Sequence, residues 1–183
     1  TVFDGLPPEV LAVDEVVGWH ATTRLLRGLE RRVAADPGWR DDVTEAASLA
    51  RGRSSGMARF ALARALSNLD QHEDALVTFA GLLEEPGDQD PGHLLRAATR
   101  ACLDAIPAAR GSFLRGDVVP AGRLESVAAV LERAAALEGQ GVTAAQRAEA
   151  LVALARAAYA CGDEPRARDA LERASAEPPG RLA

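Results

Sequence analysis

Apolar residues recur at every third or fourth position through most of the chain, which is the spacing of amphipathic helices. Clusters of Gly, Pro, Ser and Asp interrupt this pattern and mark helix ends. No run alternates between apolar and polar residues as a half-buried strand would. The pattern therefore predicts an all-α protein. The expected helices cover residues 8–33, 39–51, 57–69, 71–83, 92–105, 121–138, 144–160 and 164–176.

The first predicted helix carries apolar residues at helical spacing, which we expect to face the core: Val10, Val13, Val16, Val17, Leu25, Leu26, Leu29 and Val33. Gly18 and Gly28 weaken its middle, because glycine is a poor helix former. The segment is therefore either one helix or two pieces.

Three other positions bear on where helices begin and connect. Asp41 and Asp42 lie in the first turn of the second helix, near its positive end. Thr143 precedes the helix at 144–160 and is its expected N-cap. Residues 108–120 contain two glycines and a proline and are expected to form a long connection.

Two parts of the chain repeat one another. Residues 61–65 and 153–157 both read ALARA, and each helix is followed by a short polar turn and a second helix. A helical hairpin cannot bury its apolar side alone, so stacking of neighbouring hairpins is the natural solution. Beyond the ALARA segments, the matching pairs are Ala75 and Ala167, Phe79 and Leu171, and Leu82 and Ala174.

These positions resemble the tetratricopeptide repeat (TPR), whose first helix carries Leu and a small residue. Its second helix carries a small residue and an aromatic one, and a proline closes the unit. In the first copy these are Leu62, Ala63, Ala75, Phe79 and Pro86; in the second they are Leu154, Ala155, Ala167, Leu171 and Pro178. The resemblance implies stacked antiparallel hairpins, in a right-handed superhelix or a less regular array.

The resemblance organises residues 1–183 as a single helical-repeat domain. Residues 56–91 and 148–179 form the two repeats that match well. Residues 91–147 form an expanded repeat that contains the 108–120 connection, and residues 8–52 form a degenerate or capping hairpin.

Composition narrows the function classes. The net charge is −6 and the sequence pI about 5.1, which argues against a nucleic-acid partner. No run of apolar residues is long enough to cross a membrane, so we expect no membrane partner. Cys102 and Cys161 are the two cysteines, and we expect buried, reduced thiols in a cytoplasmic protein.

No constellation of residues indicates catalysis. His20, His72 and His93 do not have metal-ligand spacing, and no CxxC motif or phosphate-binding glycine loop is present. We expect His20 to be packed and the other two histidines to be surface residues. The sequence thus predicts no enzyme activity, no metal and no cofactor.

The resemblance also implies a ligand groove lined by the first helix of each hairpin. Arg64 and Arg156 occupy the same register of their repeats, one position after the small residue, and Arg100 or its neighbour Thr99 lies near that register between them. Guanidinium groups suit carboxylates, so the expected ligand is a carboxylate-bearing peptide or protein. Phe60 completes this expected groove.

Two main hypotheses for function follow. The first is a non-catalytic scaffold of the TPR type that binds a protein or peptide. The second is self-association as a homodimer through an exposed apolar side of a terminal hairpin. A helical enzyme is a further class for which no residue constellation argues. TPR arrays also occur as regulatory modules of larger kinases, ATPases or transcription regulators, and this alternative stays open.

Overall fold

A computed structural model describes residues 3, 5–106, 122–138 and 141–178 of the chain. Within these residues the chain forms nine helices and no strand, which confirms the all-α prediction. The expected connection at 108–120 lies outside the described residues. The helices are α1 (Pro8–Leu11), α2 (Asp14–Val33), α3 (Trp39–Ala50), α4 (Gly56–Asn68), α5 (His72–Glu84), α6 (Pro91–Ala105), α7 (Arg123–Ala135), α8 (Ala144–Ala160) and α9 (Glu164–Ala176).

The chain divides into two compact units, residues 1–78 and residues 79–183, with the boundary inside α5. This boundary does not coincide with the predicted repeat limits at residues 56 and 91. We call the two parts unit 1 and unit 2 and describe each by itself.

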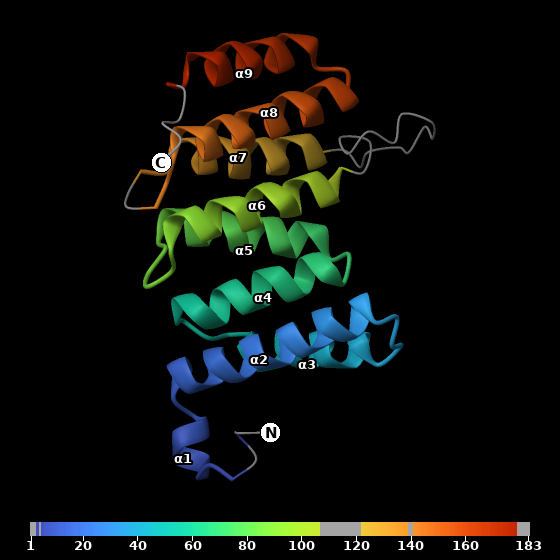
Figure 1. Cartoon of the computed structure of the whole chain (residues 1–183), viewed down its shortest axis with the longest axis vertical. Coiled ribbons are helices and arrows are strands. Elements are labelled where there is room, and N and C mark those ends of the chain that lie inside the picture. The colour runs from blue at the N-terminus through green and yellow to red at the C-terminus, as the bar shows by residue number, and fades with distance from the viewer. Residues whose placement is uncertain (1–2, 4, 107–121, 139–140, 179–183) are drawn as a thin grey trace. The chain divides into compact units, whose positions relative to one another are not determined.

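In unit 1, α2 packs against both α3 and α4 (Figure 1). The helices α2 and α3 are antiparallel, because Asp14 at the start of α2 bonds Ser54 just after α3. The helices α2 and α4 run in the same direction, since Gly18 lies against Ala58 near the start of α4. At the other end, Arg32 Nη1 donates to Asn68 Oδ1 at 2.8 Å. A first helix therefore contacts its hairpin partner and the next first helix.

The two glycines of α2 do not divide the helix, contrary to one of the two expectations. A Cβ atom on Gly28 would lie 2.7 Å from Val43 Cγ2, and one on Gly18 would lie 3.0 Å from the Ala58 nitrogen. Both glycines are buried where α3 and α4 approach α2. The chain breaks instead between α1 and α2, immediately before Asp14.

The predicted apolar positions of this segment are confirmed in part. Val17, Leu25 and Leu29 pack into the core, whereas Val10, Leu26 and Val33 are exposed, Val33 to 91%. The side of α2 that packs against α3 and α4 also carries the two buried glycines.

A buried ion cluster joins α2 to α3. Asp42 is 2% exposed, and it accepts hydrogen bonds from Arg27 Nε at 2.9 Å and from Arg27 Nη2. Arg31 Nη1 lies 3.0 Å from its Oδ2 and Arg24 Nη1 lies 3.7 Å from its Oδ1. The hydrogen bonds from Arg27 are the main cause that lowers the pKa of Asp42, and the nearby guanidinium charges add to it. Asp42 is thus a structural acceptor and not merely a favourable charge at a helix start.

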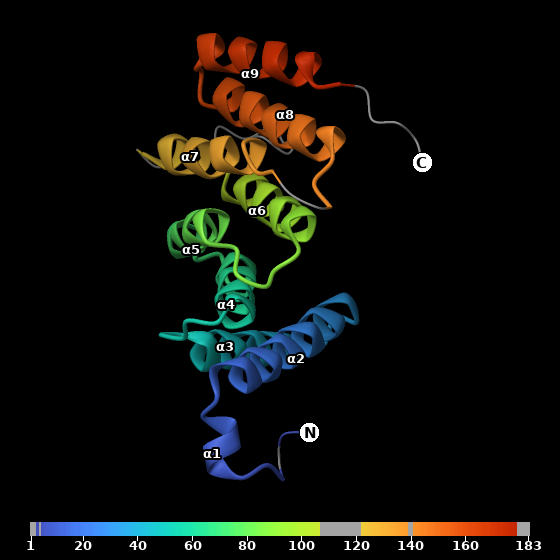
Figure 2. The ribbon, with the colours of Figure 1, turned by 90° about the vertical axis from the view of Figure 1, so that its left-hand side faces the viewer.

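In unit 2, α6 to α9 form two hairpins, and Figure 2 shows α8 and α9 as neighbours. The helix α6 runs parallel to α8, because Gln146 Nε2 donates to the Gly92 carbonyl at 3.4 Å near both N-termini. A Cβ atom on Gly92 would lie only 2.3 Å from the Gly141 carbonyl oxygen, so the backbones meet there without a side chain between them. Unit 2 therefore repeats the first-helix pairing of unit 1.

The second helices of unit 2 are joined by ion pairs. Arg166 of α9 pairs with Glu125 of α7 at 3.0 Å. Arg173 pairs with Glu132 at 2.6 Å, two turns further along both helices. These two rungs run in the same order along the two helices, so α7 and α9 are parallel.

The local predictions for α8 and α9 have different outcomes. Thr143 caps α8 as expected, and Gln146 completes a reciprocal capping box. Leu171, matched in sequence to the fully buried Phe79, is 52% exposed on α9. No described helix covers that side of α9. The TPR resemblance and the superhelix both stay predictions.

Candidate functional site

Phe60 and Arg64 lie one turn apart on α4, and the structure brings these two predicted residues together. The Arg64 guanidinium carbon lies 5.8 Å from the centre of the Phe60 ring, within the range of a cation–π contact. Phe60 is 9% exposed and Arg64 is half-buried. Burial lowers the pKa of Arg64, because desolvation disfavours its charged form.

The local sequence explains why α4 holds this pair firmly. Ser55 caps the helix by accepting a hydrogen bond from the Ala58 nitrogen at 3.2 Å. Ala61 and Ala65 share one side of α4 and are fully buried against α2 and α3, and Ala63 is fully buried on another side, so neighbouring helices approach α4 closely. Arginine and phenylalanine four residues apart then share one helix face.

Arg64 combines partial burial with the lack of an acidic partner among the described residues. Within the described residues no carboxylate forms an ion pair with Arg64. The guanidinium instead makes a cation–π contact with the Phe60 ring. The arginines that do pair with described carboxylates are Arg24, Arg27, Arg31, Arg53, Arg100, Arg133, Arg147, Arg166 and Arg173. Arg64 is therefore a partly desolvated cation without a charge to balance it in the described structure.

The other predicted groove residues lie in unit 2. Thr99 is 2% exposed, and its hydroxyl oxygen has no hydrogen-bond partner among the described residues. Arg100 is exposed and pairs with Asp104 at 3.1 Å on the same helix. Arg156 is exposed on α8, and no described carboxylate pairs with it. Of the alternatives Thr99 and Arg100, Arg100 is the one that reaches solvent.

Arg64 belongs to unit 1, whereas Arg100 and Arg156 belong to unit 2. A common groove that includes all of them stays a prediction. What the structure provides is a set of local sites, of which Phe60–Arg64 is the most completely built.

The histidines and cysteines have structural surroundings. His20 stacks on Phe3 with ring centres 4.5 Å apart, as expected of a packed residue, and His93 is exposed. Burial raises the pKa of the Cys102 thiol, which is fully buried, and also that of the half-buried Cys161. Raised thiol pKa values disfavour the reactive thiolate at neutral pH.

Across the described residues, no three His, Cys, Asp or Glu side chains gather as a metal site would require. None of the helices described has the length and apolar character needed to cross a membrane. No protein-family model matches the chain, and no curated protein or solved structure matches it either.

Proposed function

We propose that the chain is a non-catalytic binding module that recognises a carboxylate-bearing protein or peptide through the Phe60–Arg64 site of α4. The observation that carries this proposal is the half-buried Arg64 guanidinium, which pairs with no described carboxylate. A cation that is already partly stripped of water gives up less hydration when an anion arrives. The Phe60 ring restrains the guanidinium and so reduces the entropy lost on binding.

A carboxylate suits this site better than another anion of the same charge. The planar guanidinium offers paired N–H donors that match two carboxylate oxygens. The adjoining Phe60 ring is only 9% exposed, so it supports the guanidinium and leaves the guanidinium as the group that meets the ligand. Peptides that end in a free carboxylate, or that carry Asp or Glu, fit this feature.

The experiment compares binding of a peptide library with free and with amidated C-termini. We expect Arg64→Ala to weaken the selected peptides by about 1.5–3 kcal/mol, the contribution of a charge-assisted hydrogen bond. The loss should decrease at high salt, since the site is partly open to water. Arg168→Ala is the matched control, because Arg168 is exposed on α9 and pairs with no described carboxylate. If Arg64→Ala binds every selected peptide as the parent does, the proposal fails.

Self-association is the second candidate, and the outer face of α2 favours it. Trp19, Leu26 and Val33 recur two turns apart and are 58%, 54% and 91% exposed. Large apolar residues in a row along an exposed helix are typical of contact surfaces. The helix belongs to the first hairpin, and the sequence analysis expected such a contact on a terminal hairpin without choosing between the first and the last.

Sedimentation velocity at two concentrations tests this second candidate. Self-association through α2 predicts a concentration-dependent sedimentation coefficient that the double variant Trp19→Gln, Leu26→Gln removes. The control is Val77→Gln, which removes an apolar residue that is 72% exposed on another helix. A single monomeric species at both concentrations would exclude homodimerisation.

A further inference from the structure

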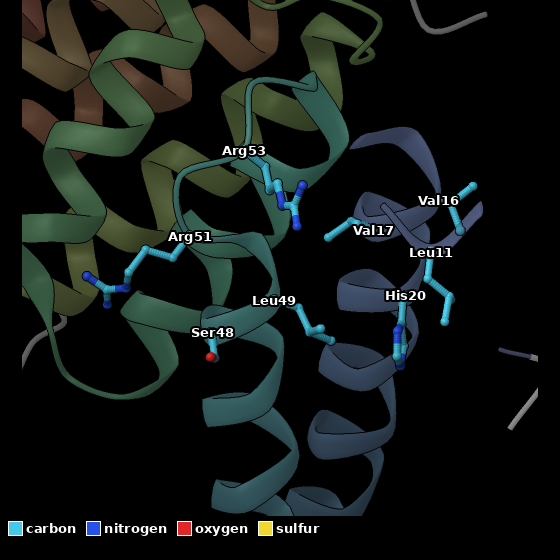
Figure 3. A pocket seen from close by; sticks show the side chains of 8 residues that line it. All are labelled: Leu11, Val16, Val17, His20, Ser48, Leu49, Arg51 and Arg53. Atoms are coloured by element: carbon cyan, nitrogen blue, oxygen red, sulfur yellow. The ribbon is translucent and has the colours of Figure 1, made fainter. Parts of the chain in front are cut away.

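Unit 1 contains a cavity of about 340 Å³ between α2, the end of α3 and the segment that follows α3 (Figure 3). This volume falls at the lower end of the range of small-molecule sites, about 300–1,000 Å³. The cavity uses neither Phe60 nor Arg64, and it is independent of the function proposed above. The residues that line it are Leu11, Val16, Val17, His20, Ser48, Leu49, Arg51 and Arg53.

The lining combines hydrocarbon walls with cationic and neutral polar groups, and it contains no carboxylate. In Figure 3, Leu49 of α3 and Val17 of α2 point into the space between the two helices, and the Arg53 guanidinium lies close to Val17. The guanidinium of Arg51 points away. The charged group that faces the cavity is therefore Arg53.

Arg53 is held in place by an acidic residue behind it. Asp14 Oδ1 lies 3.2 Å from Arg53 Nη1. Asp14 Oδ2 accepts from the Ser54 hydroxyl at 2.7 Å and from the Ser54 nitrogen at 2.9 Å. These bonds, the hydroxyl bond first, lower the pKa of Asp14 to about 2, so the carboxylate stays ionised at neutral pH. Arg53 uses one terminal nitrogen for Asp14 and has further N–H donors for a second anion.

His20 has a fixed orientation at the cavity. Its ring stacks on Phe3, and Arg24 Nε donates to its Nε2 at 3.5 Å. Ser48 adds a hydroxyl group from α3. The lining is thus divided evenly, with four aliphatic residues and four polar or charged ones.

We propose that this cavity binds a small monocarboxylate with a short hydrocarbon chain, whose carboxylate bonds Arg53 and whose chain lies between α2 and α3. An anion meets a partly buried guanidinium, and the chain gains free energy by leaving water. A peptide fits less well, because its amide groups would lie against hydrocarbon without partners. Two other cavities in unit 2, of about 390 Å³ each, are lined by one arginine and by at least two acidic residues, so the net negative charge of each lining disfavours the same anion.

The probe is hexanoate, and the measurement is the change in backbone amide chemical shifts during a titration to about 10 mM, which detects even millimolar affinity. We expect saturable shifts at Val16, Val17, Ser48, Leu49 and Arg53. Acetate lacks the hydrocarbon chain and hexanol lacks the charge, so each should bind at least about tenfold more weakly. Equal binding of hexanol and hexanoate would overturn the assignment of Arg53.

Two variants test separately whether binding requires the charge of Arg53 and whether it requires the free volume of the cavity. Arg53→Gln should weaken hexanoate about tenfold or more and leave hexanol unchanged. Val16→Phe should weaken both ligands by filling the cavity, and it keeps the proposal testable if Arg53→Gln fails to fold. Arg40→Gln is the control, because Arg40 lies on α3 but stacks on Trp39 outside the cavity lining. Parent-like hexanoate binding by Val16→Phe would overturn the site.

A final arm distinguishes the source of the carboxylate. N-acetyl-glycyl-leucine presents a peptide C-terminus with an apolar side chain and should produce shifts more weakly than hexanoate. Tighter binding of this peptide would overturn the preference for a free acid. Absence of saturable shifts with hexanoate would overturn the proposal as a whole.

Discussion

Replacing Asp42 with Asn tests how much the buried ion cluster stabilises unit 1. The substitution keeps the shape of the side chain but removes its charge, and it turns one acceptor into an amide donor that faces guanidinium groups. In the parent, the 2%-exposed carboxylate accepts two hydrogen bonds from Arg27 and lies 3.0 Å from Arg31. These contacts join α2 to α3 along the first hairpin.

The expected loss follows from these contacts and from the exposure of the partners. A charge-assisted hydrogen bond contributes about 1.5–3 kcal/mol net. The side chains of Arg27 and Arg31 are 39% and 41% exposed, so both can recover water when Asp42 is neutral. We therefore expect loss of the Asp42 charge to cost a free energy closer to that of one charge-assisted hydrogen bond than to that of three. We expect the free energy of unfolding to fall by about 2–3 kcal/mol.

The assay is urea unfolding followed by circular dichroism, with Asp41→Asn as the control on the exposed side of the same helical turn. The pKa of Asp42 is lower in the folded than in the unfolded protein, so its contribution is complete above the unfolded pKa. The difference between parent and variant should therefore be full at neutral pH and shrink below about pH 4. Equal stability of both proteins at neutral pH, or a difference that does not depend on pH, would refute this reasoning.

Three further substitutions or reactions test the packing. Gly92→Ala should destabilise unit 2 by about 1–3 kcal/mol in thermal unfolding, because its Cβ atom would meet the Gly141 carbonyl; a parent-like melting temperature would contradict this close approach. Ala75→Leu should overpack a position that is 1% exposed, again by about 1–3 kcal/mol, and an unchanged melting curve would show that the site has spare room. A thiol reagent should label Cys161 before the buried Cys102 in the folded protein, and equal rates would contradict the burial of Cys102.

The helices were predictable because they depend on periodicity and on local end signals. Thr143 indicated the start of α8, and Gln146 three residues later completes the capping box in the structure. The inner side of α2 was predictable only in part. Periodicity identified the buried Val17 and Leu25, but it did not identify the buried Gly18 and Gly28, because hydrophobicity alone ranks valine above glycine for burial.

The electrostatic contacts between helices were also beyond the sequence analysis. Asp42 reads as a first-turn acid, and its role depends on three arginines of α2 that face the same side as α3. A usable signal was present, since Arg24, Arg27 and Arg31 recur at helical spacing. Phe60 and Arg64 were identified as site residues, but the absence of an acidic partner for Arg64 requires the structure.

The two ion pairs between α7 and α9 have a consequence for the last helix. The buried residues of α9 are Ala167 and Ala170, so this helix buries little apolar surface against α8. Arg166 and Arg173 must meet Glu125 and Glu132 together, and a slide of one turn would break both pairs. The two ion pairs therefore fix the register of α9, a helix that buries little apolar surface. Because salt screens such exposed pairs, ionic strength becomes a means of loosening α9 while the hairpins before it stay closed.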